Sequence, residues 1–321
     1  MSIVKKAFRT SLLLLAFASG LTSVATMAAA PMAKTSAPGY FRMMLGEFEI
    51  TALNDGTIDL PVDKLLTQPE AHTHAALAKA YLNAPLETSV NAFLINTGKK
   101  LMLIDAGTGS LFGPTLGKLI SNLKASGYTP AQIDDIYLTH LHADHIGGLI
   151  ANNALAFPNA IVHADKKDAD FWLSQKNMDS ASTDQKDGYK NAIASINPYV
   201  VAKKFVSFSG NSSIVDGITS YATYGHTAGH TIYKVESKGE KLWVIGDLIH
   251  VNAVQLEHPQ VTIAFDSDQK QAAAERDKVF IDGSAQNVLF AASHIQFPGI
   301  GHLRKEGKSY EWIPVNFIQL R

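Results

Sequence analysis

Short apolar runs rich in β-branched residues alternate along the chain with windows of helical periodicity. Helices are expected near residues 67–83, 110–126, 130–133, 165–176, 185–197 and 267–282. The apolar runs predict strands at Phe48–Leu53, Val90–Ile95, Lys100–Ile104, Asp135–Leu138, Ile161–His163, Ile218–Tyr224, Thr231–Val235, Leu242–Ile245, Val261–Phe265, Asn287–Ala291 and Trp312–Phe317. Strand pairs mixed with helices predict two central sheets with outer helices, and not one doubly wound sheet.

Turn residues between these runs predict hairpins at Asn54-Asp55-Gly56, Thr97-Gly98 and Lys238-Gly239. No break in composition divides the body of the chain, so residues 40–321 are expected to form one domain. The preceding residues 31–39 are rich in Pro, Ala and Ser and predict a flexible leader.

Residues 1–30 have the pattern of an export signal. Three basic residues precede the apolar run Leu12–Phe17, and the small residues Ala28–Ala30 follow it. A membrane anchor is the alternative, but the run is shorter than the about 20 residues that a spanning helix needs. We therefore expect a periplasmic or secreted protein without stable membrane insertion.

The charge balance argues against a polyanionic partner. The chain has 28 basic and 29 acidic residues, and removal of the three basic residues of the signal leaves 25 basic residues and a net charge of −4. Nucleic acid is therefore not an expected partner.

The 321-residue chain contains no Cys and 12 His. The absence of Cys excludes disulfide scaffolds, thiolate metal sites, iron–sulfur clusters and thiol nucleophiles. Histidine is thus the residue type on which a metal or catalytic site would have to depend.

Three His and one Asp fall within six residues directly after a predicted strand, in the stretch His140-Leu141-His142-Ala143-Asp144-His145. If the strand ends at Thr139, the side chains of His140 and His142 project the same way, and the loop turns the last two toward a second point. This spacing suits two adjacent metal ions with imidazole and carboxylate ligands. A surface loop that is His-rich by chance is the alternative.

Three later residues also follow predicted strands, namely His226, Asp247 and His294. This edge of the strands is where α/β proteins build their sites. Asp247 is the natural bridge between two ions because a carboxylate offers two oxygens, although it could instead cap a helix.

Together these motifs resemble the metallo-β-lactamase superfamily of hydrolases. HLHADH, GHTAGH, the Gly-Asp pair at 246–247 and a late His form its motif set, and the resemblance implies an α+β fold of the αββα sandwich type. The segments PGYFRMMLGEFEITALNDG, VNAFLINTG to LIDAGTGSLFGPTLGKL, and SHIQFPGIGHLRKEGKSYEWIPVNF look like the methyl parathion hydrolase branch, whose members are akin to acyl-homoserine lactonases.

The resemblance implies a ligand set for two divalent ions, with zinc first and manganese, cobalt or iron as alternatives. One ion would be held by His140, His142 and His226, the other by Asp144, His145 and His294, and Asp247 would bridge them together with a hydroxide. Asp105 would support the ligand loop, unless it is a plain turn residue. Aromatic residues of the substrate pocket would be Phe112, Trp172 and Tyr189, where Phe is more usual at the last position; ordinary core aromatics are the alternative.

The expected activity is hydrolysis of neutral esters, most of all aryl organophosphate triesters, lactones and aryl esters. The hydroxide would attack carbon or phosphorus, and Asp247 would be the catalytic residue that passes a proton to the leaving group. An exported β-lactamase is an alternative that the bridging Asp247 disfavours, and a non-catalytic periplasmic metal-binding protein is another. The resemblance also suggests a homodimer.

The seven other histidines are expected to serve as structural or solvated residues. His72 and His74 lie two apart in a helical window, so they point in different directions. His230 belongs to GHTAGH but is expected to be structural. His250 and His302 could reach the pocket without being ligands; His163 and His258 have no partner motif.

Overall fold

The structure, a computed structural model, describes residues 30–320. Except for Ala30, the predicted export signal lies outside the described residues. Residues 31–39 have no regular secondary structure. From Ala37 onward the described chain forms one compact unit.

The first half of this unit forms a seven-stranded mixed sheet among the described residues. Its order is β1-β2-β3-β4-β5-β8-β9, antiparallel from β1 to β4 and parallel from β4 to β9. The strands are β1 (Tyr40–Leu45), β2 (Phe48–Leu60), β3 (Leu86–Asn96), β4 (Leu101–Ile104), β5 (Asp135–Tyr137), β8 (Ile161–Asp165) and β9 (Phe205–Phe208). A separate short hairpin joins β6 (Ile150–Ala151) to β7 (Ala154–Leu155).

The second half contributes another seven-stranded sheet within residues 30–320, in the sequential order β10 to β16. All its neighbours are antiparallel except β13 and β14. The strands are β10 (Ser212–Val215), β11 (Ile218–Ala222), β12 (Thr231–Ser237), β13 (Glu240–Gly246), β14 (Leu289–Ala292), β15 (Ile300–Glu306) and β16 (Ser309–Pro314).

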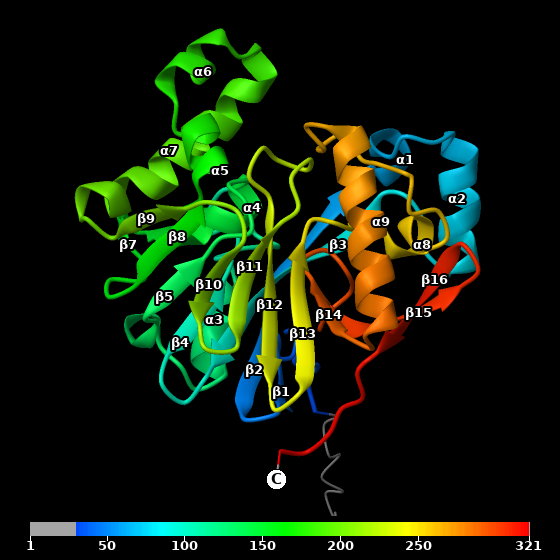
Figure 1. The fold of residues 1–321 in the computed structure, drawn as a ribbon, viewed down its shortest axis with the longest axis horizontal. Helices are drawn as coiled ribbons and strands as arrows, with labels where there is room; N and C mark the ends of the chain where they lie inside the picture. Colours follow the sequence, from blue (N-terminus) through cyan, green and yellow to red (C-terminus); the bar gives the residue numbers. More distant parts are fainter. Residues whose placement is uncertain (1–29, 321) are drawn as a thin grey trace, which may run out of the picture. The chain divides into compact units, whose positions relative to one another are not determined.

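The two sheets pack face to face, and helices cover their outer faces (Figure 1). Alternate residues of β3 separate the layers, because Phe93 and Ile95 join the core between the sheets while Leu94 joins the core under the helices of the first sheet. Burial on both faces explains why this strand reads as a continuous apolar run. The expected αββα sandwich is confirmed.

Helices pack on each outer face and at one end. The first sheet is covered by α3 (Leu119–Ala125), α4 (Ala143–Ile146) and α7 (Thr183–Val201), whose apolar residues share one core cluster with it. The second sheet is covered by α9 (Gln269–Ala285). Helices α1 (Val62–Leu65), α2 (Glu70–Lys79) and α8 (Asn252–Gln255) form a smaller cluster, and α5 (Lys166–Trp172), α6 (Gln175–Ser180) and the 3-10 turns η1 (Pro130–Gln132) and η2 (Gly147–Leu149) complete the described elements.

Several expected elements differ in the structure. The triplet Asn54-Asp55-Gly56 lies inside the long strand β2 as a bulge and not in a hairpin. Residues 261–265 make an isolated bridge between Leu66 and Ile263 instead of a strand, because their apolar side chains pack into the small cluster near α8. In the window 110–126 only α3 is helical, after the glycines Gly113 and Gly117, whose φ angles are positive. Strands β1, β6, β7, β9, β10 and β15 lie outside the predicted strands.

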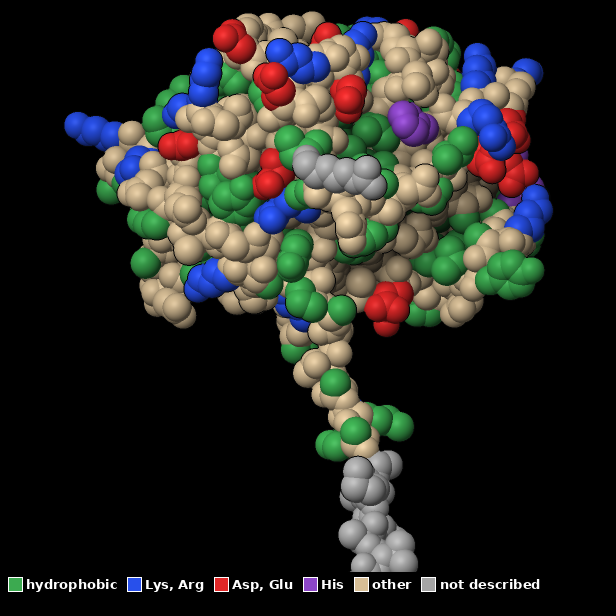
Figure 2. Space-filling model, turned by 90° about the horizontal axis from the view of Figure 1, so that it is seen from below, with side chains coloured by type: hydrophobic (Ala, Val, Ile, Leu, Met, Phe, Trp, Pro, Cys, Tyr) green, Lys and Arg blue, Asp and Glu red, His purple; other side chains and the backbone are tan. Residues whose placement is uncertain are grey.

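On the face drawn in Figure 2, basic and acidic side chains are interspersed with neutral surface, and no large area there has a single sign. Among the described residues, no helix combines the length and apolar character that crossing a bilayer requires.

Candidate metal centre

The histidine-rich segments meet at one edge of the sandwich, where several strands end. His140–His145 follow β5, Asp247 follows β13 and His294 follows β14. His226 lies in the connection between β11 and β12. Three of these connections start at the carboxyl ends of strands, β5 in the first sheet and the neighbours β13 and β14 in the second. This arrangement gathers residues more than 150 positions apart.

One group of donors contains three imidazoles and a carboxylate: His140, His142, His226 and Asp247, whose donor atoms all lie within 4.8 Å of one another. Nε2 of His226 is 3.1 Å from Nδ1 of His142 and 3.4 Å from Oδ2 of Asp247. Nε2 of His140 is 3.6 Å from the same oxygen. Imidazole and carboxylate donors that converge in this way can hold a divalent metal ion.

The second group of donors also includes Asp247. Its members are Asp144, His145, Asp247 and His294, again within 4.8 Å of one another. Oδ1 of Asp247 lies 3.1 Å from Nε2 of His145 and 3.2 Å from Nε2 of His294. Oδ2 of Asp144 lies 3.3 Å from Nε2 of His294. Nε2 of His294 is equally close, 3.2 Å, to Oδ2 of Asp247. One buried carboxylate thus lies between the two groups, with Oδ1 toward His145 and Oδ2 toward His226.

Unpartnered polar atoms at this place fit a metal pair. In the described chain, Nε2 of His140, Nε2 of His145 and Oδ1 of Asp247 are buried and, despite the short distances given above, form no hydrogen bond. Leaving such atoms unpaired in the interior is costly. All three belong to the converging donor sets, so bound cations would satisfy them.

The opposite ring nitrogens of the imidazoles are held by neighbouring groups. Nδ1 of His226 lies 2.8 Å from the Asp266 carboxylate, and Nδ1 of His145 lies 2.8 Å from Asp105. Nδ1 of His294 is 3.0 Å from the backbone oxygen of Ser89. A partner on one nitrogen fixes the ring and leaves the other nitrogen as the donor for a metal.

Asp105 ties together two points of the HLHADH segment. Its carboxylate accepts hydrogen bonds from the backbone N–H and the hydroxyl of Thr139, both at 2.8 Å, besides its contact with His145. Its φ is +63°, an unusual backbone conformation that the buried contacts hold in place.

Two further carboxylates of the site, Asp168 and Asp266, were not among the residues predicted from the sequence. Asp168 accepts from the backbone N–H of Leu141 at 2.9 Å, the Thr227 hydroxyl at 2.9 Å and the Gly229 N–H at 2.6 Å. It therefore connects the segment that carries His140 and His142 with the segment that carries His226. Asp168 offered no sequence signal, because it stands in the charged stretch Lys166–Asp170 at the start of α5, and Asp266 offered none beyond its place before the N-cap of α9.

Burial and the central carboxylates oppose each other in setting the imidazole pKa values. Burial alone lowers them, but contacts with Asp247 and Asp266 raise the pKa of His226 to about 9. Asp247 and Asp144 likewise overcome burial and raise the pKa of His294 to about 10. Burial against other imidazoles lowers the pKa of His142 to about 3. Negative charge is thus concentrated on Asp247, as expected of a cation site.

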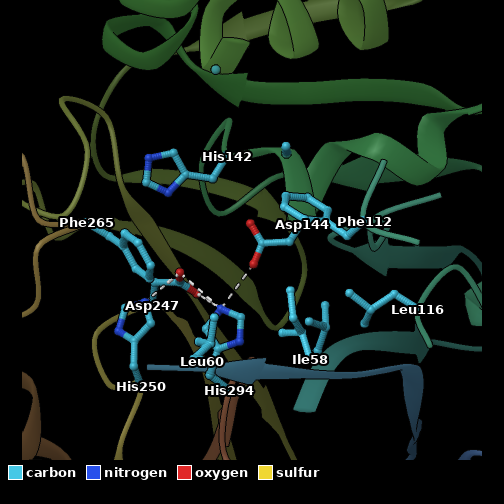
Figure 3. Close-up of a pocket in the computed structure, with 13 residues that line it drawn as sticks. Ile58, Leu60, Phe112, Leu116, His142, Asp144, Asp247, His250, Phe265 and His294 are labelled. Atoms are coloured by element: carbon cyan, nitrogen blue, oxygen red, sulfur yellow. Dashed lines mark hydrogen bonds and ion pairs between the residues drawn. The ribbon is translucent and has the colours of Figure 1, made fainter. Parts of the chain in front are cut away.

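An apolar cavity of about 270 Å³ opens beside these donors. In Figure 3, Phe112, Ile58 and Leu116 lie on one side, Phe265 and His250 on the other, and Asp144 and Asp247 between them. His250 therefore reaches the cavity, with its Nε2 3.1 Å from Oδ2 of Asp247. The wall contains no Lys or Arg among the described lining residues.

The three aromatic residues expected in the pocket have different positions. Phe112 lines the cavity, but Trp172 and Tyr189 are absent from its wall. The Trp172 ring packs behind His142 at a centroid distance of 5.4 Å, and Tyr189 packs on Trp172 at 4.9 Å. Helix α7 presents Gly188 to the cavity instead, because Tyr189 is turned inward by the helical rotation.

The other histidines lie away from the donor groups or face other partners. His230 is buried and binds the backbone N–H of Asp247 through Nε2. His302 contacts the Val288 oxygen, and His163 contacts Asp135. His72, His74 and His258 are exposed; His74 and the carboxylates of Asp63 and Glu70 form a surface group.

Comparison with solved structures places the chain among metal-dependent hydrolases. A hydrolase of the beta lactamase superfamily, AbOPH, is 38% identical with a TM-score of 0.84, and the alignment covers 89% of this chain and 100% of that one. AidC, a dizinc quorum-quenching lactonase solved with a homoserine product, is 27% identical with a TM-score of 0.80 over 88% of this chain and 99% of that one. A probable metal-dependent hydrolase from Staphylococcus aureus, at 24% identity, TM-score 0.66 and coverage of 78% and 91%, shows the fold alone.

A search of curated proteins finds no match. The sequence profile of the Metallo-beta-lactamase superfamily matches residues 86–285, which include the connections that carry most of the donors. The chain belongs to the metallo-beta-lactamase superfamily and is a metal-dependent hydrolase of that superfamily.

Proposed function

We propose that the protein hydrolyses neutral lactones and aryl esters, and aryl phosphotriesters as a secondary activity, at a centre of two divalent ions. The observation that carries the proposal is the position of the Asp247 carboxylate between the two groups of donors. Its Oδ1 lies 3.1 Å from Nε2 of His145 and its Oδ2 lies 3.4 Å from Nε2 of His226, next to an apolar cavity. Zinc suits these donors best, and manganese, cobalt or iron are also compatible with them.

The proposed ligands follow from the two donor groups. His140, His142 and His226 hold one ion, and Asp144, His145 and His294 hold the other, with Asp247 shared. When bound there, the ions supply Lewis acidity and a water molecule of lowered pKa. This chemistry needs no Ser or Cys nucleophile, in keeping with a chain that has no Cys.

The cavity supports a neutral and largely apolar substrate. Its wall combines aliphatic and aromatic side chains from β2, the segment after β4 and the segment before α9. Without a cationic side chain on the described wall, an anionic substrate would find no partner apart from the metal centre. An acyl chain or an aryl group would exclude water from the same surface.

The side chains of the site have separate tasks in this proposal. Phe112 and Phe265 contact the apolar part of the substrate and orient its ester group toward the metal centre. Asp247, an ionised carboxylate at rest, would accept at Oδ2 the proton that the attacking water gives up and pass it to the leaving oxygen. His250, 3.1 Å from this oxygen, orients the carboxylate from the side of the cavity.

The similarity to known structures supports hydrolysis in general and lactone cleavage in particular. One structure is named for a lactonase bound to a homoserine product, and the other as a hydrolase. Because aryl phosphotriesters are largely synthetic, we propose that lactone or ester cleavage is the main activity.

A substrate panel on the zinc-loaded chain tests the proposal. We expect kcat/KM for acyl-homoserine lactones or aryl esters to exceed that for a paraoxon-like triester. A triester efficiency several orders of magnitude above both other classes would reverse the proposed order. Nitrocefin serves as the probe for β-lactamase activity, for which we expect no turnover. Loss of hydrolysis on chelation, and its return with added metal, would exclude a protein that only stores metal.

We also propose that the protein is exported, because of the basic and apolar pattern of residues 1–30. Cell fractionation of the full chain and of a chain lacking these residues tests this: only the full chain should reach the periplasm or the medium. Equal distribution of the two chains would contradict export by this segment.

A further inference from the structure

Asp55 is a buried carboxylate that the proposed function does not use. It lies in the bulge of β2, where the register with β3 shifts between Asn54 and Gly56, and its side chain has no exposed surface. A bulge re-aims a side chain that regular pairing would direct elsewhere. The side chain of Asp55 points toward the segment 106–119, which connects β4 to α3.

Four hydrogen bonds join this carboxylate to both ends of the segment. At the first end, Thr108 donates its backbone N–H at 3.0 Å and its hydroxyl at 2.6 Å to Oδ2. At the other end, Gly117 donates to Oδ2 at 3.0 Å and Leu119 donates to Oδ1 at 2.9 Å. One side chain thus closes the segment into a loop.

The middle of the segment forms part of the cavity wall. Phe112 and Leu116 line the cavity, and 41% of the Phe112 surface is exposed at its mouth. Residues 105–118 have no regular secondary structure, so ladder hydrogen bonds do not hold these side chains in place. Their positions depend on how the two ends of the loop are anchored.

The same carboxylate also connects the loop to the neighbouring part of the wall on β2. Ile58 and Leu60 follow Asp55 on β2 and line the cavity together with Phe112 and Leu116 (Figure 3). All four lie on elements that meet at the carboxylate, since β2 carries it and the loop is bound to it.

The backbone contacts leave little room for rearrangement around Asp55. A Cβ on Gly107, whose φ is +71°, would lie 2.6 Å from Oδ1 of Asp55, and one on Gly56 would lie 2.1 Å from the backbone oxygen of Thr115. Glycine at both positions allows this close approach. The start of the loop also contacts the metal-binding segment, through Ala106 N–H to the His145 oxygen at 2.7 Å.

We propose that Asp55 is a positioning residue that sets the apolar wall of the cavity and thereby the recognition of the acyl or aryl part of the substrate. It neither lines the cavity nor belongs to the donor groups. The recognition step rests on the proposed function, whereas the anchoring of the loop does not.

The test uses the full zinc-loaded chain and two substitutions. Asp55→Asn keeps the size of the side chain but places an amide N–H against at least one of the four donors. Thr108→Val removes one of the four hydrogen bonds with little change in shape, and it carries the test if the first variant fails to fold. Asp135→Asn is the matched control, because Asp135 is also a buried carboxylate with two side-chain partners, His163 and Lys100, away from the cavity wall.

Two measurements do not depend on turnover. Amide hydrogen exchange within residues 106–119 should become faster in both variants, and more so in Asp55→Asn, while zinc content stays at the wild-type value. Binding of hexanophenone, a neutral uncleaved probe with a phenyl ring and an acyl chain, should weaken at least about fivefold in calorimetry, because the wall that contacts it is no longer preorganised. The control should change neither quantity.

Kinetics then separate recognition from chemistry. For 4-nitrophenyl hexanoate, KM should rise about tenfold in Asp55→Asn with kcat changed less than about twofold, the pattern of lost uniform binding. For 4-nitrophenyl acetate, whose short acyl group makes less contact, the rise in KM should be smaller.

The outcomes are distinguishable from failure of the proposed function. A wild-type chain that cleaves no ester overturns the proposed function, while exchange and hexanophenone binding still decide the role of Asp55. Unchanged exchange in residues 106–119, or equal hexanophenone binding in all variants, would overturn the proposal. Loss of zinc in Asp55→Asn would also overturn it, by showing that the residue acts on the metal centre instead of the wall.

Discussion

The backbone N–H of Asp247 donates to Nε2 of His230 across 3.1 Å. The other ring nitrogen of His230 lies 2.9 Å from the Thr223 hydroxyl. Burial lowers the pKa of His230 to about 3, so the ring stays neutral and can accept this hydrogen bond. A histidine outside both donor groups therefore holds the backbone of the shared carboxylate.

We predict that His230→Ala weakens zinc affinity by about 10- to 100-fold although all seven proposed ligands remain, because Asp247 loses its backbone anchor. Competition with a chromophoric chelator measures the affinity. His302→Ala is the control, since the His302 ring is hydrogen-bonded to the Val288 oxygen and lies outside the donor groups and the cavity wall. Equal affinity of the His230 variant and the wild type would show that this hydrogen bond does not position Asp247.

Asp168 provides the second prediction. Asp168→Ala should lower zinc affinity about 10- to 100-fold and reduce the free energy of unfolding by about 1–3 kcal/mol, because three buried donors lose their acceptor. Asp170→Ala, two residues along the same helix, removes an exposed carboxylate paired with Lys166 and should change neither quantity. Chemical denaturation and chelator competition check both variants. Equal zinc affinities and unfolding free energies for the two variants would show that Asp168 does not hold the two ligand segments together.

Metal binding should release protons in a pH-dependent manner. Since the pKa values of His226 and His294 are about 9 and about 10 without metal, both rings carry a proton at pH 7. An imidazole ligand must be neutral, so loading releases about two protons from these rings at pH 7, and fewer as the pH rises through 9. His145 adds a further proton, because Asp247, Asp144 and Asp105 overcome burial and hold its pKa well above the usual value. Calorimetric titration with zinc in buffers of different ionisation enthalpy counts them. A proton count that stays constant or rises between pH 7 and pH 9.5 would contradict the assignment of these rings as ligands.

The cavity wall gives a contrast between two aromatic residues. Phe112→Ala should raise KM for an aryl ester at least about fivefold, because its ring lines the cavity. Tyr189→Phe should leave KM within about twofold, because the change removes a hydroxyl that does not face the wall. Steady-state kinetics decides between them, and a larger KM effect from Tyr189→Phe would place its hydroxyl in contact with the substrate.

The strands and the central motif were predictable because each is encoded locally. The apolar run before HLHADH and the Gly-Asp pair after Ile245 indicate a strand that ends in polar residues, and such an edge collects ligands. Strand β15 was missed because its second half, Arg304–Glu306, is exposed and charged, so it lacks the apolar run of a buried strand.

The residues that hold the ligands in place could not be predicted from sequence. Asp55, Asp168 and Asp266 are single carboxylates whose partners lie between 3 and 64 positions away. Asp55 was assigned to a turn by its neighbours Asn54 and Gly56, but its acceptor oxygens bind donors after β4. An Asp next to Asn and Gly can form a local turn or accept hydrogen bonds from a distant segment, and the residue types are the same in both cases. Only the fold distinguishes the two roles.

Asp247, as the carboxylate shared by two metal ions, is the residue on which the proposed hydrolysis most directly depends. The decisive measurement is elemental analysis together with ester hydrolysis, for the wild-type chain and for Asp247→Ala, with His142→Ala beside it. We predict two ions per wild-type chain, hydrolysis that chelation abolishes, and loss of both metal and hydrolysis in the variants. Full hydrolysis by Asp247→Ala, or wild-type hydrolysis that persists after the metal is removed, would contradict the account.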